Sequence, residues 1–504
     1  KFGVAICTSG PGVTNMMTGI ADAFFGNIPV IFISGQVNTY EYKYDKPIRQ
    51  QGFQEMEVVN VVKPITKYAV LLDKAEDIRY ELEKALHIAT TGRKGPVVID
   101  LPMNISRAEI NPDNLRSFIP EPETVKTFDV QQVVSLLESA KRPMLLLGGG
   151  AIGADKQIAD FIAKSQMPVV TSLMGRGTTD ETYDHYVGMI GSYGNRCANM
   201  TVAKADLLIA LGSRLDTRQT GAMYQEFIKD GMIIHVDIDN NELESHRLEN
   251  RVKVNTSVID FLEKINASTI KYNDYTEWNA RVGKIKSLYN QDQEIDRFVE
   301  NKSPYRFLQK LNEITCENDI ITVDVGQNEM WGAQTIKLKK GQRFVCSGGL
   351  ASMGFSMPVA IGMAFANPKK RIFCINGDGG FHMALQSMLL ISQYNLNIKV
   401  IVMNNEALGM ITQFQHLYFN DNMAGTTAKG GYIVPNLKAI ADSFGFPYHQ
   451  MDENNLDNNA LSEAGFALVD YQISGLTTVC PKLEYNKPIW MPLPLLSEEE
   501  IKNL

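Results

Sequence analysis

The 504-residue sequence has few cysteines, no excess of basic residues and no long apolar run. A membrane helix needs roughly 18 consecutive apolar residues, and no stretch reaches that length. We therefore expect no membrane-spanning segment. Lysine and arginine number 49 against 57 aspartates and glutamates, which gives a net charge of −8 at pH 7. This mildly acidic balance argues against nucleic acid as a partner.

The six cysteines are dispersed, and no two of them form a CxxC pair. Several stand in apolar, strand-like runs, which is typical of reduced thiols in a protein core. The sequence therefore predicts a cytoplasmic protein without a disulfide framework. The residues concerned are Cys7, Cys197, Cys316, Cys346, Cys374 and Cys480.

Apolar runs rich in β-branched residues alternate with helical patterns along the whole chain. Examples are "VAICTS", "PVIFIS", "PVVIDLP", "DLLIALGS" and "KVIVMNN". Because these runs do not alternate strictly between apolar and polar residues, they predict strands that are buried on both faces of parallel sheets. The length corresponds to about three domains of roughly 150 residues each. We therefore expect an α/β protein with three doubly wound parallel-sheet domains.

Two polar stretches divide the chain. Residues 111–129 are rich in proline and predict a linker, whereas residues 272–302 are charged and predict a surface helix followed by a second linker. Since the sequence opens inside a strand-like run, we also expect the N-terminal part of the first domain to precede Lys1 and to be absent here. The expected segments are 1–115, 125–290 and 303–485, followed by a tail at 486–504.

Polar residues follow two neighbouring strand-like runs within residues 371–406. Asp378 follows the first run, and Asn404 and Asn405 follow the second. A right-handed crossover brings both strand ends to the same edge of a parallel sheet, where α/β proteins bind ligands. A carboxylate and an amide oxygen suit Mg²⁺, which takes its remaining ligands from phosphate and water. Glycines around the aspartate let the backbone and a helix N-terminus approach a phosphate, namely Gly377, Gly379 and Gly380.

Taken alone, Gly-Asp-Gly is more often an ordinary turn, because both residue types favour turns. Followed by Asn-Asn, it resembles the cofactor motif of thiamine diphosphate-dependent enzymes. The chain as a whole resembles the acetolactate (acetohydroxyacid) synthase large subunit and its relatives. The similarity runs through "TSGPGVTNMMTGIADAFFGNIPVIFISGQV", "GFQEMEVV", "KGPVVIDLP", "VGMIGSYGNRCANM", "GSRLDTR", "HVDID", "DVGQNEMWGAQ" and "GGLASMGFSMPVAIG".

The resemblance implies a thiamine diphosphate site in the third segment. It implies that Mg²⁺ is held by Asp378, Asn405 and the carbonyl oxygen of Ala407. Met353 matches the residue beneath the cofactor, although a core methionine is the alternative, and Asn328 stands where the family often has histidine. The matching cofactor contacts are Gly326, Gln327, Asn328, Ala351, Met353, Gly377, Asp378, Gly379, Gly380, Asn405, Leu408, Gly409 and Met410.

The resemblance also implies catalytic positions, namely Gln54, Arg218, Met353 and Phe414. Gln54 matches a glutamine near the reacting carbon, and Arg218 matches an arginine that faces the substrate. Without the resemblance, the first is a helix-start glutamine and the second a surface arginine. The catalytic glutamate of the family lies upstream of the segment that matches "VAICTSGPG", so no residue of this sequence is assigned to it.

The second segment contains a G-x-G-x-x-G pattern in "LLLGGGAIG", which by itself predicts a dinucleotide fold. A nicotinamide site needs an acidic residue at the end of the next strand, where Thr171 and Ser172 stand, so a dehydrogenase is disfavoured. The resemblance instead implies FAD in a structural role. The matching positions are Arg93, Gly148, Gly149, Gly150, Leu173, Met174, Gly191, Arg214, Asp216 and Asp237.

The resemblance predicts a carboligase that decarboxylates pyruvate and transfers the two-carbon unit to a 2-oxoacid. Phe414 replaces a family tryptophan and Met103 a family lysine, which predicts little preference for 2-oxobutyrate. The alternatives are a relative with a ketosugar acceptor, a 2-oxoacid decarboxylase, and a catalytically idle nucleotide-binding protein. The family also implies a homodimer or homotetramer with the active site at the subunit interface, and a regulatory small subunit as a further partner.

Overall fold

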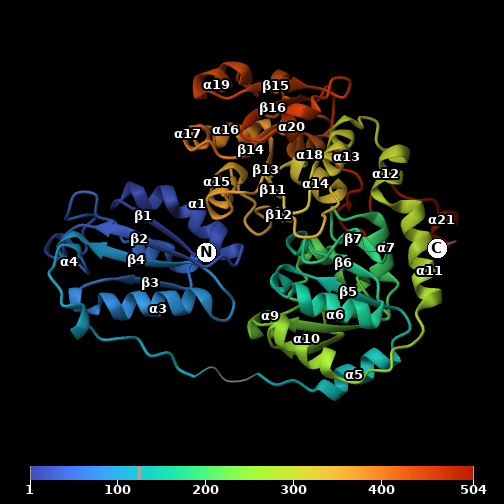
Figure 1. The fold of residues 1–504 in the computed structure, drawn as a ribbon, viewed down its shortest axis with the longest axis horizontal. Coiled ribbons are helices and arrows are strands. Elements are labelled where there is room, and N and C mark those ends of the chain that lie inside the picture. Colours follow the sequence, from blue (N-terminus) through green and yellow to red (C-terminus); the bar gives the residue numbers. More distant parts are fainter. Residues whose placement is uncertain (1, 123–125, 503–504) are drawn as a thin grey trace. The chain divides into compact units, whose positions relative to one another are not determined.

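The computed structural model describes residues 2–122 and 126–502, which form two compact units (Figure 1). The first unit holds the described residues before Lys126 together with Ser347–Ser352, and the second holds Lys126–Cys346 and the described chain from Met353 onward. Each of three sheets is wholly parallel, one in the first unit and two in the second. The predicted α/β class with three parallel sheets is confirmed. Predictions for residues 1, 123–125 and 503–504 lie outside the described residues.

The sheet of the first unit has four strands in the order β1-β2-β4-β3. Helix α3 covers one face, while α1 and α2 lie against the other, so that two hydrophobic clusters form on opposite sides. The elements are β1 (Gly3–Cys7), α1 (Pro11–Phe25), β2 (Val30–Gln36), α2 (Val58–Val62), β3 (Tyr68–Leu71), α3 (Ile78–Thr90), β4 (Val97–Pro102) and α4 (Met103–Ser106).

The first sheet of the second unit has the strand order β10-β9-β8-β5-β6-β7. Its central strands β5 and β8 are buried along their whole length, as their uninterrupted apolar sequences require. The strands are β5 (Pro143–Leu147), β6 (Val169–Thr171), β7 (Tyr186–Met189), β8 (Leu207–Leu211), β9 (Met232–Asp237) and β10 (Arg251–Asn255). The helices are α5 (Val130–Ser139), α6 (Asp155–Ser165), α7 (Arg196–Ala203), α8 (Thr217–Thr220), α9 (Asn240–Glu244), α10 (Val258–Ala267) and α11 (Thr276–Tyr289).

The third sheet has the order β12-β11-β13-β14-β16-β15. Its strands are β11 (Ile320–Val323), β12 (Arg343–Val345), β13 (Ile372–Gly377), β14 (Ile398–Asn404), β15 (Tyr448–Met451) and β16 (Ala467–Gln472). Its helices are α12 (Gln291–Phe298), α13 (Ser303–Ile314), α14 (Gln327–Thr335), α15 (Ser356–Ala366), α16 (Asp378–Met383), α17 (Ser387–Gln393), α18 (Gly409–Tyr418), α19 (Leu437–Phe444), α20 (Asn458–Ser462) and α21 (Glu498–Lys502).

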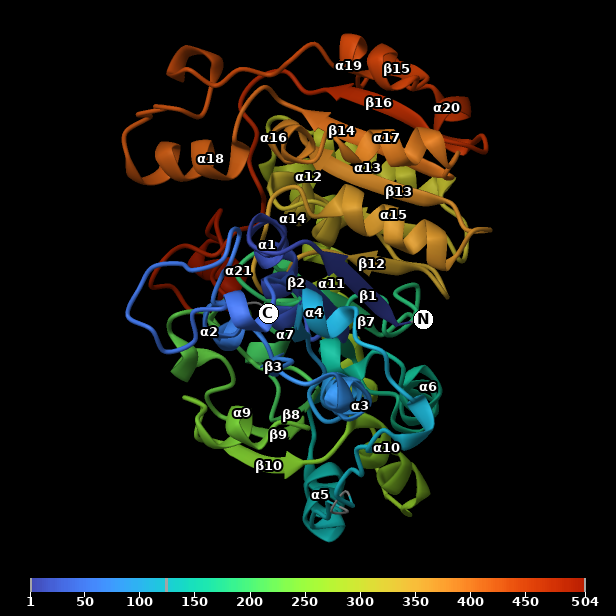
Figure 2. The same ribbon diagram turned by 90° about the vertical axis from the view of Figure 1, so that its left-hand side faces the viewer.

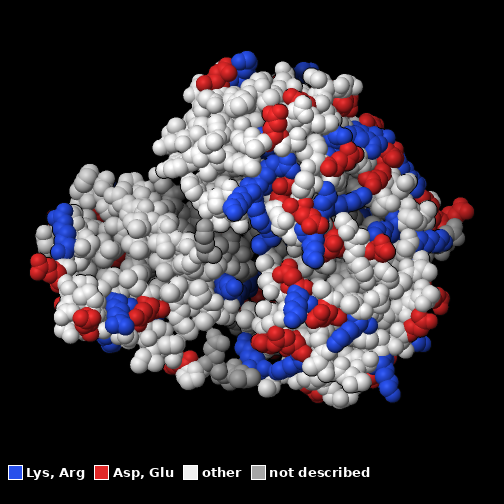
Figure 3. Space-filling view, in the orientation of Figure 1, with Lys and Arg blue, Asp and Glu red and all other residues white. Residues whose placement is uncertain are grey.

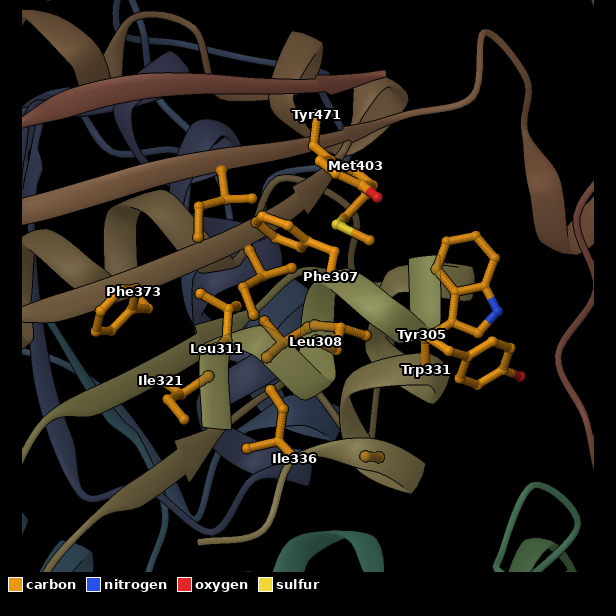
Figure 4. Close-up of a cluster of buried hydrophobic side chains, with 14 of the residues drawn as sticks. Tyr305, Phe307, Leu308, Leu311, Ile321, Trp331, Ile336, Phe373, Met403 and Tyr471 are labelled. Carbon is orange, nitrogen blue, oxygen red and sulfur yellow. The ribbon is translucent and has the colours of Figure 1, made fainter. Parts of the chain in front are cut away.

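Successive residues of the third sheet's strands pack on opposite faces. Phe373 and Ile375 belong to the cluster beneath α13 and α14, which Figure 4 shows, whereas Ile372 and Cys374 belong to the cluster beneath α15 and α17. In the first cluster the Phe307 and Tyr471 rings stack with centres 4.2 Å apart. Both faces of the sheet are therefore closed by helices, and the strand ends are left for ligands.

Two buried ion pairs tie together elements of the second unit. Arg176 pairs with Glu181 and also donates to the carbonyl oxygens of Ala333 and Ile336, at the end of α14. Arg196 on α7 pairs with Glu294 on α12 at 2.6 Å. The side chains of both pairs are at most 2% exposed, so removing one partner would leave a buried, uncompensated charge.

Residues 483–489 pack against the sheet of β5–β10. Leu483 and Ile489 belong to the cluster beneath α7 and α11, and the Leu483 N–H donates to the Ser192 carbonyl oxygen at 2.6 Å.

Figure 3 shows acidic and basic side chains interspersed over the visible face. Across the described residues, no helix is both long and apolar enough to cross a bilayer.

Candidate active site

The strand order of the third sheet reverses between β11 and β13. Strand β12 lies on one side of β11, whereas β13 and then β14 lie on the other. Open α/β sheets bind ligands outside the carboxyl ends of strands at such a switch point. Strand β13 ends at Gly377, which pairs in register with Met403 of β14, so Asp378 and Asn405 emerge side by side. The structure thus brings the two predicted strand ends together.

Three oxygen-bearing groups converge at this edge. One terminal atom of the Asn405 amide lies 2.9 Å from the Ala407 carbonyl oxygen and 3.3 Å from Asp378 Oδ2. The other terminal atom lies 3.0 Å from Thr477 Oγ1. Hydrogen bonding decides which of the two is nitrogen. If the atom near Ala407 and Asp378 is the amide nitrogen, it donates to both of their oxygens. If it is the amide oxygen, the three oxygens can together bind a cation.

The donor set therefore fits Mg²⁺. A carboxylate, an amide oxygen and a backbone carbonyl are hard ligands, and the ion would take its further ligands from phosphate and water. No cluster of three or more His, Cys, Asp or Glu side chains forms a rival metal site within residues 2–122 and 126–502. Asp378 is buried, which raises the pKa of its carboxyl, while hydrogen bonds from Tyr432 and from nearby backbone N–H groups oppose that shift.

Side-chain oxygens pack closely against several glycines at this edge. A Cβ on Gly380 would lie 2.3 Å from Asp324 Oδ1, and one on Gly409 would lie 2.0 Å from Gln327 Oε1. Gly326 has a φ of 152°, and its Cβ would lie 2.4 Å from Asn328 Oδ1. A side chain at any of these positions would have to displace the terminal oxygen of a neighbouring polar side chain.

A small polar network connects the predicted contacts. Thr477 Oγ1 donates to Gln327 Oε1 at 2.6 Å, and Gln327 Nε2 donates to Gln413 Oε1 at 3.1 Å. Asn328 Nδ2 donates to the Asp324 carbonyl oxygen at 2.6 Å. Thr477 was not predicted from the sequence, although it follows β16, the neighbour of β14, and so belongs to the same edge.

Apolar side chains lie over Gly379. A Cβ on this glycine would meet Leu408 Cδ2 at 2.9 Å and Met353 Cε at 3.0 Å. Met353 follows directly on Ser347–Ser352, in which Ala351 has a φ of 64° and its N–H donates to Ser347 Oγ at 3.0 Å. Met410 is half-buried and packs against the cluster beneath α14. Met353 thus borders the Gly-Asp-Gly turn.

Phe414 lies on α18, which Figure 2 shows beside the third sheet, beyond its strand ends. The ring is 48% exposed and is tilted against that of Tyr418, with centres 4.7 Å apart. The ammonium of Lys482 lies 4.9 Å from the centre of the Phe414 ring. The guanidinium of Arg218 lies 5.3 Å from the centre of the Tyr193 ring. Lys482 therefore lies against the two aromatic rings of α18, and Arg218 lies against the ring of Tyr193.

Glu329 on α14 was missed by the sequence analysis. It is 2% exposed, and its Oε1 atom has no hydrogen-bond partner among the described residues. Burial raises the pKa of this carboxyl to about 8, an effect that Arg218 opposes. The group is therefore mainly protonated at neutral pH. Helical spacing could not have singled it out, because every residue of α14 is buried.

Gln54 lies in the first unit, where its backbone has a φ of 63°. Its carbonyl oxygen would lie 2.8 Å from a Cβ on Gly10, so glycine is needed there. The neighbouring Glu55 carboxylate accepts backbone N–H groups from Lys43, Gln51 and Gly52. These bonds hold the loop in one conformation, with the Gln54 backbone in the left-handed region.

Arg93, a predicted FAD position, lies in the same unit and donates to Asn27 Oδ1 at 2.7 Å.

The glycine run of the central sheet packs against another strand end. A Cβ on Gly148 would lie 2.2 Å from the Gly212 carbonyl oxygen, and the Gly150 N–H donates to that oxygen at 2.9 Å. A Cβ on Gly191 would lie 2.8 Å from the Arg218 carbonyl oxygen. Backbone packing therefore accounts for these glycines whether or not a nucleotide binds.

The other predicted FAD positions in this sheet lie near the carboxyl ends of its strands. Leu173 and Met174 follow β6, and a Cβ on Gly149 would lie 3.1 Å from Met174 Cβ. Arg214 pairs with Asp216 at 3.0 Å after β8, and Asp237 ends β9. The structure thus gathers these positions along one edge of the sheet.

Comparison with known proteins identifies the same family in three parts of the chain. Residues 1–61 match the thiamine pyrophosphate enzyme N-terminal TPP binding domain. Residues 130–265 match the central domain, and residues 324–471 match the C-terminal TPP binding domain. The third match contains both strand ends of the oxygen cluster.

Relatives align over most of the chain. Acetolactate synthase isozyme 1 large subunit of Escherichia coli is 33% identical over 489 residues, covering 95% of this chain and 84% of the relative. Acetolactate synthase large subunit of Lactococcus lactis is 32% identical, covering 96% and 83%. A probable acetolactate synthase large subunit of Methanocaldococcus jannaschii is 35% identical, covering 88% and 76%. The chain therefore belongs to the thiamine pyrophosphate enzyme family, as an acetolactate synthase-like carboligase.

Proposed function

We propose that the protein decarboxylates pyruvate and joins the two-carbon unit to the carbonyl carbon of a second 2-oxoacid. The bond to the carboxylate breaks and releases CO₂. The electron pair left behind forms the new carbon–carbon bond, and the acceptor oxygen takes a proton, so no net oxidation occurs. Bound thiamine diphosphate would supply the electron sink for this chemistry. The observation that carries the proposal is the convergence of Asp378, Asn405 and Ala407 at the switch point of the third sheet.

Mg²⁺ would be held by these three groups, and the diphosphate would lie against the turns at Gly326–Asn328 and Gly377–Gly380. The support is the donor set and the close packing that keeps these turns free of side chains. Met353, beside Gly379, would orient the cofactor ring. Gln54 and Arg218 are proposed to contact the substrate.

For the acceptor we propose pyruvate, with little preference for 2-oxobutyrate. Phe414 offers a smaller ring than the family tryptophan and no N–H donor. A ketosugar acceptor or simple decarboxylation is the second candidate, favoured by the 48% exposure of Phe414, which leaves room beside the ring for a bulkier compound.

FAD is proposed to bind along the edge formed by the ends of β5, β6, β8 and β9, without changing redox state during turnover. The gathering of Gly149, Met174, Arg214 and Asp237 supports this position. We further propose a homodimer or homotetramer, association with a regulatory small subunit, and a cytoplasmic location. All six cysteines are unpaired, in keeping with a reducing compartment.

The test is a product analysis. The full chain is incubated with thiamine diphosphate, Mg²⁺ and ¹³C-labelled pyruvate, and the products are identified by NMR. Acetolactate with CO₂ supports carboligation, whereas acetaldehyde with CO₂ supports the decarboxylase alternative. Asp378→Asn serves as the negative control. If pyruvate is consumed only after a ketosugar is added, the second candidate replaces the first, and if it is never consumed the proposal is wrong.

A further inference from the structure

The two carboxylate oxygens of Asp378 have different neighbours. Oδ2 faces the Asn405 amide and joins the oxygen cluster. Oδ1 accepts a hydrogen bond of 2.6 Å from the hydroxyl of Tyr432, which lies in the loop between α18 and α19. The Tyr432 hydroxyl donates its single proton to Oδ1 and so helps, together with nearby backbone N–H groups, to hold the carboxylate in one orientation.

The loop that carries Tyr432 is tied to the other side of the same cluster. The Tyr432 N–H donates to the Thr427 carbonyl oxygen at 2.9 Å, and Thr427 forms an isolated β-bridge with Ala407. The Leu408 N–H donates to the Thr426 carbonyl oxygen at 2.9 Å. One segment, residues 426–432, is therefore bonded both to Asp378 and to the residue that supplies the carbonyl oxygen.

The Tyr432 hydroxyl also borders the Gly-Asp-Gly turn. A Cβ on Gly379 would lie 3.2 Å from its oxygen, beside Leu408 and Met353. Asp378 itself is only 2% exposed, so little water is available to hold its carboxylate in place. A hydrogen bond to an ionised acceptor is roughly twice as strong as one between neutral groups. Tyr432 is thus well placed to set the direction in which Oδ2 points.

We propose that Tyr432 is a positioning residue for the divalent cation, and this proposal rests on the Mg²⁺ site proposed above. Its hydroxyl retains Oδ1, so that Oδ2 alone is presented to the ion together with the Asn405 and Ala407 oxygens. Since the same bond anchors residues 426–432, binding of the ion orders this loop, and an ordered loop strengthens binding of the ion.

The test uses Tyr432→Phe in the full chain, because this change removes one oxygen and keeps the ring. Mg²⁺ is titrated by calorimetry in the presence of thiamine diphosphate. Loss of a side chain that orients a metal ligand weakens metal binding by about 10–100-fold, and we expect at least about tenfold here. Tyr44→Phe is the matched control, because Tyr44 also donates to an aspartate, Asp73 Oδ1 at 3.0 Å, but lies in the first unit. Its affinity should be unchanged.

Hydrogen exchange supplies a readout that does not depend on activity. Mg²⁺ should slow amide exchange in residues 426–432 of the unmodified protein and of Tyr44→Phe, but not of Tyr432→Phe. Equal or tighter Mg²⁺ binding by Tyr432→Phe would overturn the role of Tyr432 and leave the cation site standing. Failure of the unmodified protein to bind Mg²⁺ would remove the cation site and this proposal with it.

Discussion

The Nζ atom of Lys482 lies 4.9 Å from the centre of the Phe414 ring and 5.2 Å from that of Tyr418. It has no hydrogen-bond partner in the part of the chain that the structure describes, and the residue is 6% exposed. Two aromatic faces thus take the place of the oxygen acceptors that an ammonium ordinarily has. Burial lowers the pKa of this lysine as a consequence.

Lys482→Met should stabilise the protein. A buried polar group without a hydrogen bond costs about 1–3 kcal/mol, and methionine fills a similar volume against aromatic rings. We expect the free energy of unfolding at pH 7, measured with urea, to rise by about 1 kcal/mol. Because the folded-state pKa is lowered, the unmodified protein should gain stability as pH rises toward the ordinary lysine pKa of about 10.4, and the variant should lose that dependence. Lower stability at pH 7 would contradict the prediction.

Phe414→Trp should increase the preference for 2-oxobutyrate. The indole fills more of the pocket, and a difference of one methylene is worth about 10–200-fold in discrimination. The measurement is competition between pyruvate and 2-oxobutyrate as acceptors, with labelled pyruvate as donor. Tyr418→Trp, on the same helix, is the control for bulk alone. A strong preference in the unmodified enzyme that Phe414→Trp leaves unchanged would show that this position does not set the acceptor.

Asp378→Asn should abolish Mg²⁺-dependent binding of thiamine diphosphate. The substitution keeps the shape but removes the charge that compensates the cation, so the affinity should fall by more than the roughly 100-fold seen for indirect contacts. Calorimetry with and without Mg²⁺ measures it, and Asp442→Asn on the exposed face of α19 is the control. An unaltered affinity would show that the ion binds elsewhere.

FAD should bind to the purified full chain and remain oxidised during turnover with pyruvate. Titration followed by the flavin absorbance and fluorescence measures the binding. Arg214→Ala should weaken FAD binding, since the Arg214–Asp216 pair lies on the edge where FAD is proposed. Arg79→Ala is the control and should leave FAD binding unchanged, because Arg79 forms an exposed ion pair on a helix of the first unit. Absence of any flavin uptake would refute the FAD site and leave the carboligase proposal intact.

His235 should make the protein acid-sensitive. Its ring lies between the Ser213 carbonyl oxygen at 2.8 Å and Arg251 at 2.9 Å, and burial lowers its pKa to about 4. The unfolded chain binds the proton near pH 6.5, so stability is full above that pH and is lost as pH falls toward 4. Urea unfolding across this range should show the loss, and His235→Gln should flatten it. A slope that survives the substitution would assign the effect to other groups.

The oxygen cluster was predictable because two local motifs and one topological rule suffice. Gly-Asp-Gly and Asn-Asn each mark a strand end, and a right-handed crossover places those ends together. Tyr432 and Lys482 were not predictable. Each lies in an irregular segment far along the chain from its partner, where no hydrophobic period fixes a direction.

The glycine run at Gly148–Gly150 was recognised in the sequence, but the reason for its glycines could not be predicted. Its spacing predicted a nucleotide loop, yet its tightest contacts are with Gly212, more than sixty residues later. A sequence records that a position needs glycine, but not whether a ligand or a second backbone occupies the space. The strands themselves were predicted well, because buried parallel strands need unbroken apolar runs.

The return of the chain to the sheet of β5–β10 has a consequence for biosynthesis. Leu483 and Ile489 complete the cluster beneath α7 and α11, although that sheet is already encoded by residue 255. While the ribosome is still synthesising the third sheet, the cluster beneath α7 and α11 is therefore partly exposed to solvent. Nascent chains that stall before Ile489 should therefore expose more apolar surface than chains in which residues 483–489 have been made, and chaperones should retain them longer.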